Sequence, residues 1–266
     1  MEMLERVAQL LDLVRQHRPV VHAITNWVTA GDVANVLQAI GARPILALTP
    51  DEVEEVLAQA DALLLNLGTP TARRVETMVL AGRHANRLSK PVVFDPVGAG
   101  ASTFRKEACS RILKECRLSV IRGNRAEIGT LAGMGGELRG VDACAGPEDL
   151  RKAAVVLSGR TGAVVAISGQ QDIVTGSGKI VTVENGHPLM AYVTGTGCML
   201  AAVMAAFAAV EKNEMIATVA AVGCFGLAGE RVSPEVTGPG SFKVALLDGL
   251  FRLTAEEVRK GLRLGE

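Results

Sequence analysis

Short apolar runs alternate with amphipathic stretches along most of the chain, and this alternation limits the possible folds more than any other feature. Runs such as 62–65 and 92–94 contain only apolar residues, whereas the longer stretch 71–88 between them has a helical pattern. A strand that is apolar on both faces must be covered on both faces, as in parallel sheets whose strands are joined by helices. The sequence therefore predicts an α/β protein with a mainly parallel sheet.

The same alternation gives the expected elements. Strands are predicted at 20–24, 44–48, 62–67, 92–94, 118–121 and 163–167, with helices at 32–40, 51–59, 71–88 and 103–115. Two further runs, 172–175 and 179–183, are joined by Gly176-Ser177-Gly178, which predicts a hairpin and antiparallel strands at one edge of the sheet. A last helix should place Leu247, Phe251, Ala255, Val258 and Leu262 on one apolar stripe. No linker or repeat divides the chain, so we expect one domain over residues 1–266.

Composition excludes several classes of partner. The 28 basic and 28 acidic residues cancel, so the chain lacks the positive surface on which binding to nucleic acid or to an anionic membrane depends. The uncharged stretches 185–210 and 215–229 predict two buried helices and no membrane span. Five cysteines without a C-x-x-C pair, and a start without a basic and apolar leader, predict free thiols and a cytoplasmic location. The four histidines lack metal-ligand spacing, which argues against a metal hydrolase.

A glycine-rich segment, 194–197, stands directly before the apolar run 198–210. It places permissive backbone at the N-terminus of a buried helix, where unpaired N–H groups and the helix dipole attract anions such as phosphate. The alternative is a flexible turn in which Thr196 caps the helix. Cys198 lies in the first turn, where the same field would lower the pKa of its thiol, although most cysteines in apolar helices are inert.

Two carboxylates follow strands that are expected to be neighbours. Asp95 ends the run 92–94 and precedes Pro96, so it either serves a hard cation such as Mg²⁺ or simply opens a turn. Glu127 stands three residues after Asn124, the spacing of a capping box that needs no ligand. Carboxylates at one sheet edge repel each other unless a cation or a proton lies between them, and a phosphate-bound Mg²⁺ would meet that need.

Five segments, taken in order, resemble the hydroxyethylthiazole kinases, which belong to the ribokinase-like enzymes. They are Asn26-Trp27-Val28-Thr29, Asn66-Leu67-Gly68-Thr69, Asp95-Pro96-Val97-Gly98-Ala99-Gly100, Arg122-Gly123-Asn124 with Glu127, and Thr194-Gly195-Thr196-Gly197-Cys198-Met199-Leu200. The resemblance covers nearly the whole chain. It implies a three-layer α/β/α fold and ATP- and Mg²⁺-dependent phosphorylation of 4-methyl-5-(2-hydroxyethyl)thiazole in thiamine salvage.

The resemblance also implies roles for individual residues. Asn26, Leu46 and Gly195 would line the thiazole site, and Asp95 and Glu127 would hold the metal. The nucleotide and its phosphates would be bound by Arg122, Asn124, Ser168, Thr194, Gly195, Thr196 and Gly197. Cys198 replaces the catalytic Asp of most ribokinase-like enzymes, and it either assists as a partial thiolate or leaves room for the substrate hydroxyl. Relatives commonly have Met at the position of Leu46, a swap that conserves apolar volume. The family implies a homotrimer whose pockets are completed by a neighbouring subunit.

Two other functions stay open on the sequence. One is a related small-alcohol kinase of the same fold, acting on a hydroxymethylpyrimidine or a pyridoxal-like ring. The other is a nucleotide-binding protein without catalytic activity, which would bind ATP and turn over no alcohol.

Overall fold

The sheet has the expected parallel body and antiparallel edge. In a computed structural model, which describes residues 2–134 and 147–265, the strand order is β2-β1-β3-β4-β5-β6-β7-β8-β9. Pairing is parallel from β2 through β6 and antiparallel from β6 through β9. The strands are β1 (Val20–Ile24), β2 (Arg43–Ile45), β3 (Ala62–Asn66), β4 (Val92–Asp95), β5 (Val120–Asn124), β6 (Val164–Ser168), β7 (Asp172–Gly176), β8 (Lys179–Val183) and β9 (Leu264–Gly265).

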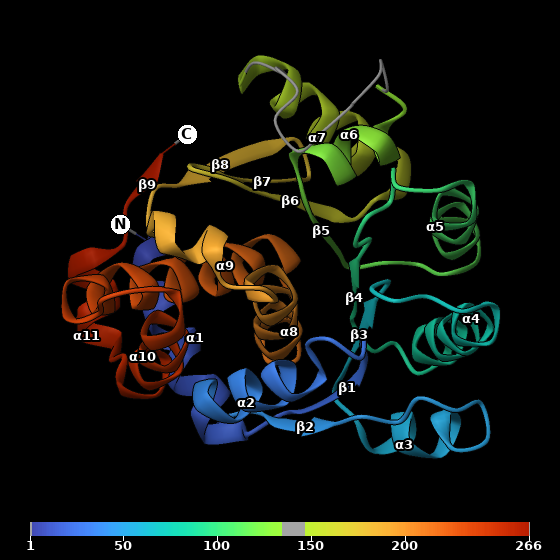
Figure 1. Cartoon of the computed structure of the whole chain (residues 1–266), viewed down its shortest axis with the longest axis horizontal. Coiled ribbons are helices and arrows are strands. Elements are labelled where there is room, and N and C mark those ends of the chain that lie inside the picture. The colour runs from blue at the N-terminus through green and yellow to red at the C-terminus, as the bar shows by residue number, and fades with distance from the viewer. Residues whose placement is uncertain (1, 135–146, 266) are drawn as a thin grey trace.

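Helices cover both faces of this sheet, which gives the predicted three layers (Figure 1). One face is covered by α1 (Glu2–His17), α2 (Ala30–Ile40), α8 (Thr196–Ala208), α9 (Glu214–Val232), α10 (Pro239–Arg252) and α11 (Ala255–Gly261). The other is covered by α3 (Val53–Gln59), α4 (Ala72–Arg87), α5 (Thr103–Glu115), α6 (Arg125–Ala132) and α7 (Pro147–Thr161). Short 3-10 helices, Pro188–Tyr192 and Ser233–Glu235, precede α8 and follow α9.

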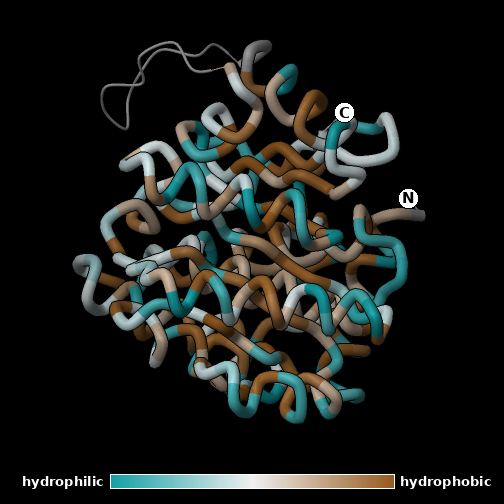
Figure 2. The backbone as a smooth tube through the Cα atoms, turned by 90° about the vertical axis from the view of Figure 1, so that its right-hand side faces the viewer, coloured by the Kyte–Doolittle hydropathy of each residue, from teal (hydrophilic) through white to brown (hydrophobic). Residues whose placement is uncertain are grey.

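Each strand supplies side chains to both cores, as its apolar sequence requires. In β3, Leu64 packs in the core under α8 and α9, whereas Leu63 and Leu65 pack in the core under α4 and α5. The backbone coloured by hydropathy shows the most apolar segments running through the middle of the molecule (Figure 2). Burial on both faces therefore explains why these strands do not alternate between apolar and polar residues.

The two uncharged stretches form α8 and α9, which pack against each other in the interior. In the part of the chain that the structure describes, the segment Glu214–Glu235 alone is long and apolar enough to cross a membrane. Of its apolar window, 83% is buried inside the protein. The prediction of two buried core helices is confirmed.

Several predicted boundaries are wrong. The strand expected at 44–48 ends at Ile45, and the strand expected at 118–121 runs on to Asn124. Arg122, Gly123 and Asn124 pair with Ala166, Ile167 and Ser168 of β6, so these polar residues belong to the sheet and not to the loop after it. Hydropathy ends a strand too early where its last residues serve a site.

The single C-terminal helix is also wrong. α10 ends at Arg252, and Thr254 begins α11 by accepting the Glu257 N–H while the Glu257 carboxylate accepts the Thr254 N–H. This capping box interrupts the predicted stripe, and Phe251 is 70% exposed instead of buried.

Free thiols are confirmed for the cysteines that the structure describes. Cys109, Cys116, Cys198 and Cys224 are all buried and unpaired. Cys144 lies outside the described residues. Burial raises the pKa values of Cys109 and Cys224 to about 12, so these thiols are inert at neutral pH.

The buried His22 predicts a pH-dependent stability. Its Nε2 lies 2.8 Å from the Ala47 carbonyl oxygen. Burial lowers the pKa of His22, and the hydrogen bond with Ala47 and the charge of Glu52 oppose this shift in part. Below about pH 6.5 the unfolded chain binds a proton that the folded chain resists, so stability falls by at most about 1.4 kcal/mol per pH unit until the folded pKa is reached. His22→Gln replaces the ring by an amide, which can still donate to the Ala47 carbonyl group and does not titrate. Urea unfolding at pH 7.5 and pH 5.5 should therefore show a larger loss for the wild type, and equal losses would contradict this role of His22.

Candidate active site

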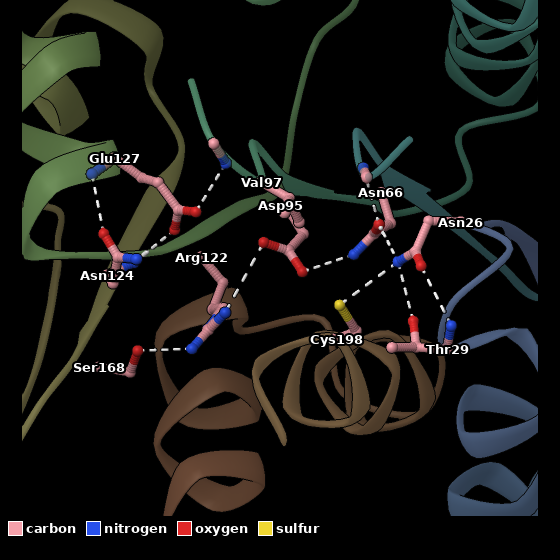
Figure 3. A network of polar contacts seen from close by, with 12 residues as sticks. Asn26, Thr29, Asn66, Asp95, Val97, Arg122, Asn124, Glu127, Ser168 and Cys198 are labelled. Carbon is pink, nitrogen blue, oxygen red and sulfur yellow. Dashed lines mark hydrogen bonds and ion pairs between the residues drawn. The ribbon is translucent and has the colours of Figure 1, made fainter. Parts of the chain in front are cut away.

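A chain of polar contacts crosses the carboxyl ends of the parallel strands β1, β3, β4, β5 and β6 (Figure 3). It runs from Asn26, just after β1, to Ser168 at the end of β6. Parallel strands bring their carboxyl ends to one edge of the sheet, where open α/β folds bind ligands. The structure thus brings together residues from distant parts of the sequence, since Asn26 and Ser168 are 142 positions apart.

Asn26 organises the first end of this chain. Its Nδ2 lies 2.8 Å from Thr29 Oγ1, 2.9 Å from Asn66 Oδ1 and 3.5 Å from Cys198 Sγ. Its Oδ1 accepts the N–H groups of Val28 and Thr29, which fixes the turn before α2. The side chain therefore links the turn after β1 to the first turn of α8.

Asn66 extends the contacts to the carboxylate of Asp95. Its Nδ2 donates to Asp95 Oδ2 at 2.7 Å, and its Oδ1 also accepts the Gly68 N–H at 3.0 Å. No individual role was predicted for Asn66 from the sequence. A signal was present, because Asn66 is a polar residue at the end of an otherwise apolar strand, in register with Asp95 on the neighbouring strand.

Asp95 is fully buried, and only one of its two carboxylate oxygens accepts a hydrogen bond from the described residues. Its Oδ1 accepts no hydrogen bond from the described residues, and the nearest cation is Arg122, whose Nη1 lies 3.7 Å away. Burial raises the pKa of Asp95 to about 7; Arg122 opposes this rise and the charge of Glu127 adds to it. This carboxylate therefore favours a proton or a cation beside it.

Glu127 forms the capping box that its spacing allowed. Its Oε2 accepts the Asn124 N–H at 2.8 Å, while Asn124 Oδ1 accepts the Glu127 N–H at 2.9 Å. Its Oε1 accepts the Gly98 N–H at 2.8 Å, which ties the loop after β4 to α6. Among the residues the structure describes, no group of three or more His, Cys, Asp or Glu side chains could hold a metal ion by itself.

The glycine-rich segment forms the N-terminus of α8, as predicted. Gly195 is the N-cap with φ +91°, and a Cβ there would lie 2.6 Å from Thr29 Cγ2, so only glycine fits. Thr196 does not cap the helix, because its hydroxyl donates to the carbonyl groups of Met190 and Val193. Within residues 2–134 and 147–265, no acceptor meets the N–H groups of Gly197 and Cys198. These two donors are free for a ligand.

Arg122 lies directly against this helix start. A Cβ on Gly197 would lie 2.2 Å from Arg122 Nη1, and the guanidinium also donates to Ser168 Oγ. A guanidinium and the positive end of a helix dipole therefore face the same space, beside the buried Asp95. This arrangement is suited to binding the phosphates of a ligand.

The sequence left two interpretations of Cys198 open, a partial thiolate and an inert thiol, and the structure favours the inert one. Burial raises the pKa of its thiol, and the charge of Asp95 raises it further, while hydrogen bonds and Arg122 oppose the shift. Desolvation is the largest of these causes, and the thiol is protonated at neutral pH.

Two predicted residues lie outside these contacts. Leu46 follows the edge strand β2 and packs, partly buried, against the core under α8. Thr194 is exposed, one residue before the N-cap of α8. The hydrogen bonds of the site reach neither side chain in the described part of the chain, so their sequence-based roles stay predictions.

Known proteins of one family match the chain along nearly its whole length. The model of the hydroxyethylthiazole kinase family matches residues 11–256. A hydroxyethylthiazole kinase of Thermoanaerobacter pseudethanolicus is 50% identical over 95% of this chain and 96% of its own length. One of Chloroflexus aggregans is 46% identical over 98% of this chain and 94% of its own length.

Solved structures agree. The structure of the hydroxyethylthiazole kinase protein of Pyrococcus horikoshii OT3 has a TM-score of 0.91 and 39% identity, covering 97% of this chain and 98% of its own. A pyridoxal kinase of Staphylococcus aureus, in complex with AMP-PCP and pyridoxal, has a TM-score of 0.61 and 17% identity, covering 80% and 87%. The second likeness shows the shared ribokinase-like fold alone.

The contact between Gly197 and Arg122 predicts the effect of a single methyl group. Gly197→Ala places a Cβ against the guanidinium and beside the free N–H groups, so we expect the affinity for ATP to fall at least tenfold, about 1.4 kcal/mol. Calorimetric titration with ATP measures this loss. Gly159→Ala in α7, where a Cβ meets nothing within 4 Å, is the matched control and should bind ATP normally. Equal affinities of the two variants would place the phosphates elsewhere.

Proposed function

The chain belongs to the hydroxyethylthiazole kinase family, and from this membership we propose how its site transfers the terminal phosphoryl group of ATP to the hydroxyl of 4-methyl-5-(2-hydroxyethyl)thiazole. This reaction salvages the thiazole half of thiamine. The observation that carries the proposal is the pair of free N–H groups at the start of α8, which faces Arg122 and adjoins the buried Asp95. We place the reaction in the cytoplasm, where four free, buried thiols stay reduced.

The nucleotide side of the site lies at the ends of β5 and β6. Ser168 and Asn124 would contact the nucleotide, and the segment 194–197 would wrap its terminal phosphate. The N–H groups of Gly197 and Cys198 would donate to the oxygens of the phosphoryl group in transfer, and the Arg122 guanidinium would balance its charge. Phosphoryl transfer has a loose transition state, so these fixed donors supply much of the catalysis.

Asp95 and Glu127 would hold Mg²⁺ together with the phosphates. The fit rests on Asp95 Oδ1, a buried oxygen without a hydrogen bond, because such an oxygen suits a hard cation. Both Glu127 oxygens accept backbone N–H groups, which favours contact with the ion through water. Since no cluster of three ligating side chains is present in the described residues, the phosphates and water would complete the shell. When bound, the ion neutralises charge on the phosphates.

The acceptor side lies around Asn26. We assign Asn26, Gly195 and Leu46 to the thiazole site, with the alcohol placed beside the Cys198 thiol. Because burial keeps this thiol protonated, we assign Cys198 a shaping role at the reacting hydroxyl instead of that of a general base. A loose transition state does not require early removal of the hydroxyl proton.

This shaping role predicts the outcome of Cys198→Ala. The variant removes the sulfur and leaves the α8 N–H groups in place, so turnover should stay within about tenfold of the wild type. Steady-state assays with ATP and a panel of thiazole, pyrimidine and pyridine alcohols measure this, and both proteins should prefer the thiazole. Complete loss of turnover in a folded variant would contradict the shaping role. Preference for another ring, or ATP binding without turnover, would favour one of the two alternative functions.

We also propose that the protein is a homotrimer whose neighbouring subunits complete the pockets. Support comes from exposed apolar side chains on the segments beside the site, where Thr29 meets Gly195. These side chains are Trp27, Val28, Ile45 and Tyr192. Apolar side chains gathered at the rim of a site are typical of an interface.

The trimer predicts the effect of a charge at this rim. Sedimentation velocity should show three copies of the 27.8 kDa chain, and Tyr192→Glu should dissociate them and raise the KM for the alcohol. Val155→Glu, at an exposed apolar residue of α7 on the opposite face of the sheet, should leave the assembly intact. A fully active wild-type monomer would refute interfacial sites.

A further inference from the structure

Arg74 in α4 holds together two turns. One follows β1 and carries Asn26, and the other follows Asn66, the last residue of β3. Its side chain is nearly covered, since the residue is only 6% exposed. Arg74 Nη1 donates to the Thr69 carbonyl oxygen at 3.0 Å and to Thr69 Oγ1 at 3.2 Å. Its Cζ lies 4.5 Å from the centre of the Trp27 ring, a cation–π contact. The backbone N–H of Trp27 also donates to Thr69 Oγ1, at 3.3 Å.

The turn that Arg74 contacts is strained and closely packed. Thr69 has φ +40°, a conformation that a β-branched residue adopts only when its surroundings hold it there. One residue earlier, Gly68 lies so close to Asn26 that an added Cβ would be 2.6 Å from the Asn26 Cβ. The turn after β3 therefore lies directly against the turn after β1, and Arg74 secures both.

The partners of Arg74 suggest a purpose beyond stability. In the described part of the chain they are a carbonyl group, a hydroxyl group and an indole ring, and none of them carries a charge. The charged side chain is desolvated without a carboxylate partner among the described residues, and this burial lowers the pKa of Arg74. An apolar residue could fill this space at lower cost, but it could not bridge the two turns.

We propose that Arg74 is a positioning residue for the acceptor alcohol. By fixing Trp27 and Thr69, it holds the Asn26 amide at its distance from Cys198. The contacts of Arg74 include none of the residues assigned to the nucleotide, which lie on β5 and β6 and in the segment 194–197. The inference rests on the proposed function, because it assigns the acceptor to the Asn26 side of the site.

Steady-state kinetics of Arg74→Met test the assignment. We expect the KM for the thiazole alcohol to rise about tenfold or more, with the KM for ATP within twofold of the wild type. Arg73→Met is the matched control, since it removes the same charge from the preceding residue, whose side chain is 72% exposed. It should leave both KM values unchanged. Sedimentation of each variant shows whether the same assembly is being compared.

Trp27 is the only tryptophan of the chain and reports on the contact directly. The emission maximum of its ring should shift in Arg74→Met and stay unchanged in Arg73→Met, because only the first substitution removes a guanidinium from the face of the ring. Arg74→Lys keeps the charge and most of the packing but not the planar fork, so it should give a smaller rise of the same KM. If Arg74→Met does not fold, Arg74→Lys carries the test.

Equal rises of both KM values, or wild-type KM values in the Arg74 variants, would overturn the assignment. An unchanged emission maximum in Arg74→Met would overturn the contact itself. Failure of the proposed function would appear separately, as wild-type protein that phosphorylates no thiazole alcohol.

Discussion

The burial of the Asp95 carboxylate is the constraint on which the site depends. A fully buried carboxylate is unfavourable unless neighbours stabilise it, and here one oxygen receives the Asn66 amide while the other faces Arg122 without a hydrogen bond. The neighbours are in turn held by others, since Asn66 binds Asn26 and Arg122 binds Ser168. The polar chain across five strand ends is therefore one connected arrangement around a single charge.

Glycine lets the α8 helix start close enough to take part. Gly195 and Gly197 allow α8 to approach Thr29 and Arg122 at distances that any Cβ would prevent. The same close approach places Cys198 Sγ 3.5 Å from Asn26 Nδ2 and leaves two N–H groups without an acceptor among the described residues. An electropositive helix start beside a guanidinium and a half-satisfied carboxylate accommodates a phosphate and a cation together. In the proposed mechanism, the phosphate and the acceptor alcohol meet at Cys198.

Local patterns in the sequence predict the fold well and the site only in part. The parallel sheet, the hairpin and the two buried helices follow from apolar runs and turn residues that are neighbours in the chain. The strand β5 was predicted too short because its last residues are polar and belong to the candidate site. The last helix was predicted too long because the Thr254 capping box lies within an apolar stripe. The sequence could not decide between a partial thiolate and an inert thiol at Cys198, because burial depth depends on the whole fold. Asn66 and Arg74 were missed because their partners are turns and strands brought close by folding.

The most direct test is the structure of the protein with the thiazole alcohol and a non-hydrolysable ATP analogue bound. The account predicts the terminal phosphate within hydrogen-bonding distance of the Gly197 and Cys198 N–H groups, with the alcohol oxygen beside the Cys198 sulfur. A terminal phosphate bound far from the start of α8 would contradict it.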